Sequence, residues 1–247
     1  MQELSKICKN QLSCFSVAKK YISKKNNVFL LKAEKPDTRA SFFVYKEYFR
    51  PERMRREIQM LSLLKEKGVF VPVIYGTGEN YILLEYLEGT LLLDYYCWLE
   101  SRQGSAGSAL QWSADQFIYN LCYWFKSFYI ATREIFGEQL IMGDVNFRNF
   151  IIRDKIYGID LEECREGRME EDLGSLCAFG LTYAPTFTAW KLAMLGNLVG
   201  IFCQELDLNR EVVKAEIQKQ LLVLARIRGK LNETEEFLGK NMHLNLL

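Results

Sequence analysis

The chain has 247 residues, of which 49% are hydrophobic and 4 are proline, and its formal net charge at pH 7 is +1. This composition excludes a largely disordered chain, and the length suffices for one large domain or two lobes with a substantial core. The balanced charge excludes a broad basic field for nucleic acid or an anionic membrane, although a local basic patch is compatible with it.

The sequence is typical of an intracellular protein. Its 7 cysteines occur singly, none in a C-x-x-C pair, so neither a zinc site nor a disulfide framework is predicted. The first residues lack the basic and then apolar pattern of a signal peptide. Residues 190–206 are the most apolar helix candidate, but Lys191, Gly196, Asn197 and Gly200 make them a poor membrane span. We expect a soluble, cytoplasmic protein without a membrane partner.

The first half of the chain is predicted to form strands around one helix. Residues 28–32 and 41–48 are rich in β-branched and aromatic residues, and the turn sequence at 34–38 separates them. Pro51 followed by an acid marks a helix start, and apolar residues at helical spacing extend the helix to Glu66.

A hairpin of residues 70–75 and 81–86, joined by a glycine-containing turn, follows this helix. The second half is predicted to be mainly helical, with a surface loop at 102–108 that is rich in Gly and Ser. Helices are expected at residues 90–101, 113–136, 170–182, 186–205 and 210–228.

Residues 142–162 carry the side chains of greatest chemical interest. Asp144 lies on a loop, Asn149 follows five residues later, and Asp160 ends the second strand of a short hairpin. Transfer of a phosphoryl group from a nucleotide requires a carboxylate near the attacking hydroxyl and oxygen ligands for magnesium. An acid at the end of an apolar strand is costly unless it is paired or bound to metal. A plain surface turn would also account for Asp144 and Asn149, because both residue types favour turns.

In this order of elements, and in the loop Gly-Asp-Val-Asn-Phe-Arg-Asn at 143–149, the chain resembles the protein-kinase-like superfamily. Within this superfamily, its sequence pattern is similar to that of the aminoglycoside and choline phosphotransferases and of the small atypical kinases. The resemblance implies an α+β, bilobal fold. Residues 1–87 would form an N-lobe with a small antiparallel sheet, one helix and the hinge, and residues 88–247 a helical C-lobe with the catalytic loop.

The resemblance also implies roles for single residues of the catalytic loop. Asp144 would accept the proton of the attacking hydroxyl, and Asn149 and Asp160 would bind Mg2+. Where the family often has Phe-Gly after the second acid, this chain has Leu161 and Glu162. Glu162 or its neighbour Glu163 could assist the metal, or either could be solvated.

In the N-lobe, Lys46 resembles the lysine that binds the first two phosphates of ATP, with Glu57 as its helix partner and Glu52 as the alternative partner. An exposed strand lysine and a solvated helix glutamate would account equally well for Lys46 and Glu57. The backbone near Glu85 and Leu87 resembles the hinge that binds adenine, although a plain strand and turn would also fit.

Three further residues bear on the resemblance. Asp172 resembles the buried acid that steadies the catalytic loop through its backbone amides. Met142 stands where the family commonly has histidine, and the only histidine is His243. A mechanism with a histidine base or a Ser-His-Asp triad is therefore excluded.

The main departure from the family pattern lies at residues 19–27, which contain four lysines and no glycine. Glycines there would let backbone amides approach the phosphates closely. Either the lysines supply charge instead or nucleotide binds weakly, and a solvated basic turn is the simpler explanation of the lysines.

These patterns predict a phosphotransferase that uses ATP and Mg2+ and acts on a hydroxyl group. The short segment after Asp160 offers little platform for a peptide, which favours a small-molecule acceptor. Two alternatives remain: a catalytically weak or inactive, kinase-like binding module, and a small atypical kinase whose acceptor is a protein.

Overall fold

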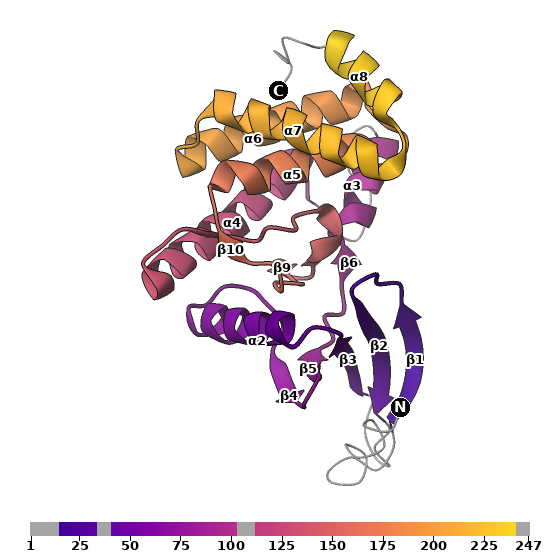
Figure 1. The fold of residues 1–247 in the computed structure, drawn as a ribbon, viewed down its shortest axis with the longest axis vertical. Coiled ribbons are helices and arrows are strands. Elements are labelled where there is room, and N and C mark those ends of the chain that lie inside the picture. Colours follow the sequence, from indigo (N-terminus) through magenta and orange to yellow (C-terminus); the bar gives the residue numbers. More distant parts are fainter. Residues whose placement is uncertain (1–14, 34–40, 103–111, 241–247) are drawn as a thin grey trace.

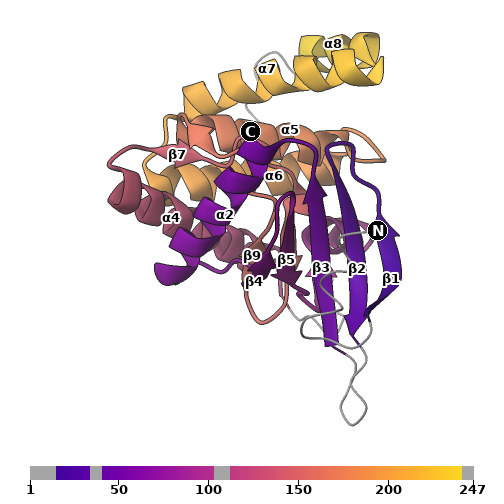
Figure 2. The same cartoon turned by 60° about the horizontal axis from the view of Figure 1, so that its bottom comes forward.

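A computed structural model of the chain describes residues 15–33, 41–102 and 112–240, and it contains a strand-rich part and a helical part (Figure 1). The strand-rich part is a five-stranded antiparallel sheet with the order β1-β2-β3-β5-β4. Its strands are β1 (Phe15–Tyr21), β2 (Asn26–Ala33), β3 (Ser41–Tyr48), β4 (Ile74–Thr77) and β5 (Tyr81–Glu85). Figure 2 shows β1, β2 and β3 side by side.

Strand β3 lies in the middle of this sheet and has the bounds that the sequence predicts. Lys46 is paired with Val28 of β2 and with Ile82 of β5. Because successive side chains of a strand point to opposite faces, Lys46 and its neighbour Tyr45 lie on different sides. Tyr45 packs in a small buried cluster with Leu31 on one face, which leaves Lys46 on the other face.

Helix α2 (Pro51–Glu66) also has its predicted bounds and begins with proline in its first turn. It lies between the sheet and the helical part (Figure 1). Its buried face consists of Met54, Glu57, Met60, Leu61 and Leu64. The helical spacing of these residues therefore carries Glu57 inward among apolar side chains, whereas Glu52 is exposed.

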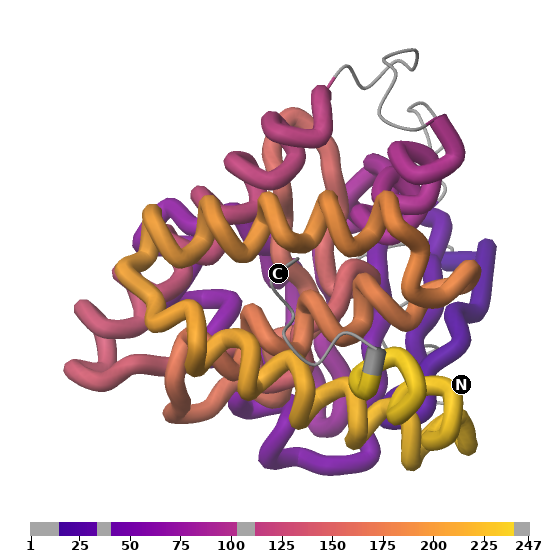
Figure 3. Tube along the Cα trace, turned by 90° about the horizontal axis from the view of Figure 1, so that it is seen from above, coloured from indigo at the N-terminus to yellow at the C-terminus, as the bar shows by residue number. Residues whose placement is uncertain are grey.

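The helical part contains six α-helices among the described residues. They are α3 (Leu92–Ser101), α4 (Ala114–Phe136), α5 (Met169–Thr182), α6 (Ala189–Leu206), α7 (Arg210–Arg228) and α8 (Leu231–Lys240). Helix α4 starts with a capping box between Ser113 and Gln116 and ends at Gly137 in the left-handed region. Helices α6, α7 and α8 lie on the face away from the sheet (Figure 3).

Short strands complete the helical part and carry the loop of chemical interest. They are β6 (Thr90–Leu91), β7 (Leu140–Ile141), β8 (Phe150–Ile152), β9 (Ile156–Gly158) and β10 (Arg165–Glu166), with a 3-10 turn at Phe147–Asn149. The predicted hairpin is β8 and β9, to which β6 adds a third strand.

The two parts are joined at the carbonyl of Phe70, which precedes β4. It accepts hydrogen bonds from the Gly158 backbone N–H at 3.0 Å and from Trp124 Nε1 at 2.8 Å. A Cβ atom at Gly158 would lie 2.0 Å from the ring of Trp124, so only glycine fits there without displacement of the ring. This contact fixes the position of the sheet relative to α4.

Several predicted bounds differ from the structure. Strand β4 begins at Ile74, because Val69 and Val71 are buried in a loop instead of a strand. Helix α3 begins at Leu92, since Thr90 and Leu91 pair with β8. Some predictions fall outside the described residues: the turn at 34–38, the loop beyond Arg102, and the residues His243, Cys8 and Cys14.

The sequence patterns did not predict β1, β7, β10 or α8. Strand β5 ends at Glu85 and β6 begins at Thr90, so the predicted lobe boundary after Leu87 falls in the connection between them. The division into these two domains stays a prediction. Within the described residues, no helix combines the length and the apolar character that a membrane span requires.

Candidate active site

Residues 142–149, here called the Asp144 loop, are held in place by a buried carboxylate. Asp172 of α5 is 1% exposed and accepts hydrogen bonds from the backbone N–H groups of Met142 at 2.9 Å and Gly143 at 3.1 Å. The Tyr129 hydroxyl donates a third hydrogen bond to it at 3.0 Å. The expected contact of this acid with loop amides is confirmed. Gly143 has φ +79°, and a Cβ there would lie 2.5 Å from the carbonyl oxygen of Glu163.

The charge of Asp172 gives a pH dependence that can be measured. Burial raises the pKa of Asp172 to about 6 from its ordinary 3.8, although its three hydrogen bonds oppose that shift. Because the folded-state pKa is the higher one, the folded protein binds more protons between these values. The contribution of Asp172 to stability is therefore complete below about pH 4 and declines as the pH rises to about 6, by about 3 kcal/mol.

We expect the free energy of unfolding of the wild type, minus that of Asp172→Asn, to decrease over this pH interval and to be constant above it. Urea unfolding of both proteins at half-unit intervals from pH 4 to pH 7 measures the difference. A difference that increases with pH would show that the hydrogen bonds outweigh burial and that the folded-state pKa is lowered.

Lys46 lies at the centre of a cluster with Glu57, Asp160 and Glu162, here called the Lys46 cluster. Its Nζ atom is 2.6 Å from Glu57 Oε2, 2.6 Å from Asp160 Oδ1 and 3.2 Å from Glu162 Oε2. Lys46 and Glu57 are 6% and 1% exposed. The structure therefore brings the predicted pair together, and it also joins this pair to the predicted metal ligand Asp160.

The electrostatics of the Lys46 cluster favour a permanently charged lysine. Burial disfavours the ammonium form of Lys46, but Glu57, Asp160 and Glu162 outweigh burial and raise its pKa above the ordinary value. Burial also raises the pKa of Glu57, against the attraction of Lys46. The Tyr48 hydroxyl donates a hydrogen bond to Glu57 Oε2 at 2.5 Å, so that carboxylate has two donors. Tyr48 gave no signal in the sequence.

Asp160 follows β9 and adopts a left-handed backbone, with φ 63°. This conformation is uncommon outside glycine, and aspartate is one of the residues that tolerate it. Leu161 is completely buried, whereas the side chain of Asp160 is 37% exposed. The turn thus directs an apolar residue into the core and leaves the Asp160 carboxylate beside Lys46.

Asn149 connects Asp144 to Asp160. Its side-chain Nδ2 donates to the backbone carbonyl of Asp144 at 2.6 Å, and the backbone carbonyl of Asn149 accepts from the Ile159 N–H at 2.9 Å. The donation through Nδ2 leaves Oδ1 as the atom that could bind a cation. The phosphotransfer prediction depends on Asp144, Asn149 and Asp160, and these residues therefore lie close together in the structure.

A second set of charges extends the Lys46 cluster toward Asp144. Lys25, in the turn between β1 and β2, lies 2.7 Å from Asp144 Oδ2 and 2.9 Å from Glu163 Oε1. Arg53 of α2 lies 2.8 Å from Glu163 Oε1 and 3.5 Å from Glu162 Oε1. For Lys25, the interpretation of the 19–27 lysines as a solvated basic turn is wrong. In the sequence, the acids Glu162 and Glu163 close after Asp160 indicate that cations lie nearby, because clustered carboxylates are costly without them.

The predicted hinge residues lie at the connection between the two parts. Glu85 closes β5, and its N–H donates to the Val73 carbonyl at 2.8 Å. Its carboxylate accepts from the Val73 N–H at 3.1 Å and from Arg153 at 3.4 Å. Leu87 is buried among core residues. The Glu85 N–H and side chain are thus engaged within the protein, and a role of Glu85 and Leu87 in binding adenine stays a prediction.

The residues of the Lys46 cluster fit a divalent cation of the magnesium type. Glu57, Asp160 and Glu162 offer carboxylate oxygens that lie within 4.8 Å of one another, and hard cations prefer such oxygen ligands. All three carboxylates pair with Lys46, but Glu57 is buried and also accepts a hydrogen bond from Tyr48. The more exposed Asp160 is therefore the better candidate, together with Asn149 as predicted and with Glu162.

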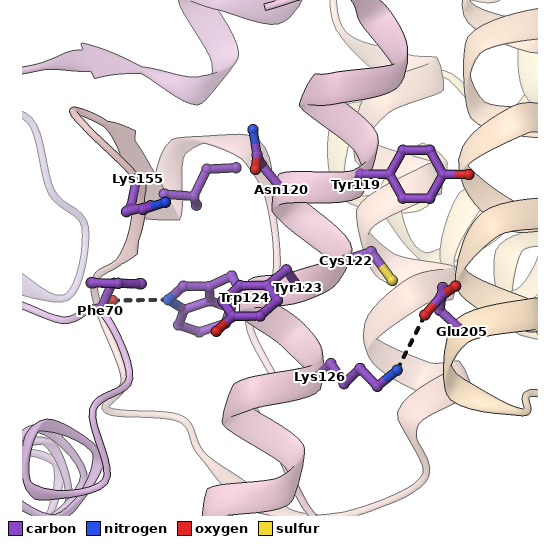
Figure 4. Close-up of a pocket in the computed structure, with 10 residues that line it drawn as sticks. Phe70, Tyr119, Asn120, Cys122, Tyr123, Trp124, Lys126, Lys155 and Glu205 are labelled. Atoms are coloured by element: carbon purple, nitrogen blue, oxygen red, sulfur yellow. Dashed lines mark hydrogen bonds and ion pairs between the residues drawn. The ribbon is translucent and has the colours of Figure 1, made fainter.

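A cavity of the described residues lies elsewhere, along α4. It has a volume of about 530 Å³, and Trp124, Tyr119, Tyr123 and Lys126 are among the residues that line it (Figure 4). Among its described lining residues, none belongs to the predicted site. We therefore locate the site by its charged groups and not by the size of a cavity.

No protein-family model and no curated protein matches the sequence. Among solved structures, the chain is similar to choline kinase from Cryptosporidium parvum Iowa II, with a TM-score of 0.56 and 12% sequence identity, over 100% of this chain and 97% of that chain. The chain has the protein-kinase-like fold. The predicted α+β, bilobal architecture is thereby confirmed.

On this fold the charged groups come from both lobes. The N-lobe contributes Lys25 from the turn between β1 and β2, Lys46 from β3, and Arg53 and Glu57 from α2. The acids Asp144, Asp160, Glu162 and Glu163 belong to the loops of the helical C-lobe. The ion pairs therefore span the boundary between the lobes, and a ligand bound among them would contact both.

Proposed function

We propose that the protein is a phosphotransferase that uses ATP and Mg2+ and transfers the terminal phosphate to a hydroxyl group of a small molecule. The observation that carries the proposal is the buried Lys46, which is 2.6 Å from both Glu57 and Asp160, beside the loop that holds Asp144 and Asn149. A desolvated lysine among three carboxylates is costly as a purely structural device, and such perturbed groups gather at functional sites.

Each residue has a separate role in the proposed mechanism. Lys46 binds the inner phosphates, and Glu57 holds its ammonium in position. Asp160 and Asn149 hold Mg2+, which when bound neutralises charge on the phosphates. Asp144 accepts the proton of the acceptor hydroxyl. The hydroxyl oxygen forms a bond to the terminal phosphorus, and the bond from that phosphorus to the bridging oxygen breaks, with its electron pair leaving on the nucleoside diphosphate.

The proposal of a small-molecule acceptor is based on the short segment between Asp160 and α5. This segment spans residues 161–168, and its strand β10 pairs with β7. A stretch of that length, tied to the helical lobe, offers little surface for docking an extended peptide. One similar solved structure is a choline kinase, whose name also specifies a small acceptor with a hydroxyl group.

One observation favours an inactive binding module as the second candidate. Lys25 forms an ion pair with Asp144 at 2.7 Å, so the proposed base is occupied by a cation of the same chain. A binding module would keep this pair, whereas an enzyme must exchange it when substrates bind. The small atypical kinase with a protein acceptor ranks lower, because the short 161–168 segment argues against it.

Thermal unfolding with and without ligands tests the proposed function. We expect ATP with Mg2+ to raise the Tm by several degrees, since ligand at 100 times its Kd stabilises the folded state by about 2.7 kcal/mol. ATP with EDTA should give a much smaller shift, and Asp160→Asn should lose the magnesium-dependent part. If millimolar ATP with Mg2+ leaves the Tm unchanged, the binding module is the better interpretation.

A further inference from the structure

The turn between β1 and β2 delivers one lysine into the proposed active site. Lys25 is separated from Asp144 by 119 residues in sequence, yet its Nζ atom donates to Asp144 Oδ2 at 2.7 Å and to Glu163 Oε1 at 2.9 Å. Lys25 is half-buried, whereas the adjacent Lys24 is exposed. The two neighbouring lysines therefore have different surroundings.

The backbone of the turn is organised to hold Lys25 in this position. The Ser23 hydroxyl oxygen accepts hydrogen bonds from the N–H groups of Lys25 at 3.3 Å and Asn26 at 3.2 Å. The Asn26 side chain donates to Glu162 Oε2 at 2.6 Å, which fixes the start of β2 against the Lys46 cluster. Fixing a lysine side chain costs conformational entropy, so compensating interactions are needed.

A role in neutralising Glu163 does not by itself explain why Lys25 is held in this position. Glu163 Oε1 already has Arg53 Nη2 at 2.8 Å. Burial disfavours the charged form of Lys25, but its hydrogen bonds with Asp144 and Glu163 outweigh burial and raise the pKa above the ordinary value. The ammonium is therefore kept charged directly beside the proposed base, where the terminal phosphate of a nucleotide would have to lie.

The turn also lacks what a phosphate-binding loop normally uses. With no glycine in residues 19–27, its backbone amides cannot approach phosphate oxygens as closely as those of a glycine-rich loop. An ammonium on a flexible stem supplies positive charge from a greater distance. A cation that is already aimed at the site can take over the function of the missing amides.

We propose that Lys25 is a phosphate-binding residue that contacts the terminal phosphate of the bound nucleotide, an inference that rests on the proposed function. Without nucleotide, the ammonium is paired with Asp144. With nucleotide, it moves to a phosphate oxygen, and Asp144 becomes free to accept the proton of the acceptor. Lys46 holds the inner phosphates, so the two lysines act on different phosphate groups.

Calorimetric titration with ATP and with ADP, each with Mg2+, tests this assignment in Lys25→Met. ADP lacks the terminal phosphate, so only the affinity for ATP should depend on Lys25. We expect Lys25→Met to weaken ATP binding about 10-fold or more and ADP binding less than about 2-fold. Lys24→Met, as the matched control, should change neither affinity. Lys25→Arg should recover part of the ATP affinity, because it keeps the charge.

The other outcomes are distinct. If the wild type binds ATP and Lys25→Met binds it equally well or more tightly, Lys25 only blocks the site and the assignment is wrong. Equal losses for ATP and ADP would show a structural role of the turn, which also overturns it. If the wild type binds neither nucleotide, the proposed function fails together with this inference. Unfolding temperatures of the variants verify that each is folded.

Discussion

Replacing Asp144 with asparagine is expected to lower the rate of phosphate transfer by about 100-fold to 10,000-fold, which is the usual contribution of a general base. The asparagine keeps the shape of the side chain but accepts no proton at neutral pH. The rate is measured as ADP release from ATP and Mg2+, with the acceptor that gives the highest wild-type rate in a panel of amino alcohols, sugars and lipid head groups.

Nucleotide binding should behave differently from the rate in this variant. The Asp144 carboxylate repels the terminal phosphate and pairs with Lys25 at 2.7 Å, so its neutralisation should leave ATP affinity unchanged or increase it. Asp154→Asn, in the exposed turn between β8 and β9, is the control and should keep the wild-type rate. Near-normal transfer by Asp144→Asn would exclude Asp144 as the base.

The parts of the fold that the sequence predicted well are those that local patterns determine. Helix α2 begins at a proline and presents a regular apolar face, and β3 is dense in aromatic and β-branched residues. The Asp144 loop was recognised because residue types and spacing together specify one chemistry. In each case the information lies within about 20 neighbouring residues.

The missed elements depend on contacts between distant parts of the chain. Strand β1 carries polar and apolar residues without a buried face, and pairing with β2 defines it. Strands β7 and β10 are two residues long and exist only through each other. Helix α8 is held by contacts such as the stacking of Phe237 on Phe187, with ring centroids 4.1 Å apart.

The same limit applies to the candidate site. Lys46 and Glu57 are separated by 11 residues and could be predicted as a pair, whereas Lys25 reaches Asp144 across 119. A run of lysines is usually solvated, and only the folded arrangement shows that one of the four faces the acids. The local charge pattern offered a hint, because only Leu161 separates Asp160 from two further acids, Glu162 and Glu163.

Lys46→Met is expected to have the largest effect on both binding and stability. Removing the ammonium leaves Glu57 and Glu162 as buried carboxylates without their main counterion, which costs about 3 to 5 kcal/mol in comparable buried pairs. Affinity for ATP with Mg2+ should decrease by at least about 100-fold, because a charged hydrogen bond to phosphate and the order of the Lys46 cluster are both lost. Urea unfolding and calorimetric titration measure the two effects.

A second variant separates the two effects of Lys46. In the double variant Lys46→Met with Glu57→Gln, one uncompensated charge is removed from the interior, and Tyr48 can still donate its hydrogen bond to the amide oxygen. We therefore expect the double variant to recover part of the lost stability and none of the ATP affinity. If its ATP affinity returns along with its stability, Lys46 acts on the nucleotide only by keeping the N-lobe folded, and its proposed contact with the phosphates is wrong. If neither returns, the cost of the substitution lies in packing around the lysine stem, and the ion pair with Glu57 contributes little to the folded state.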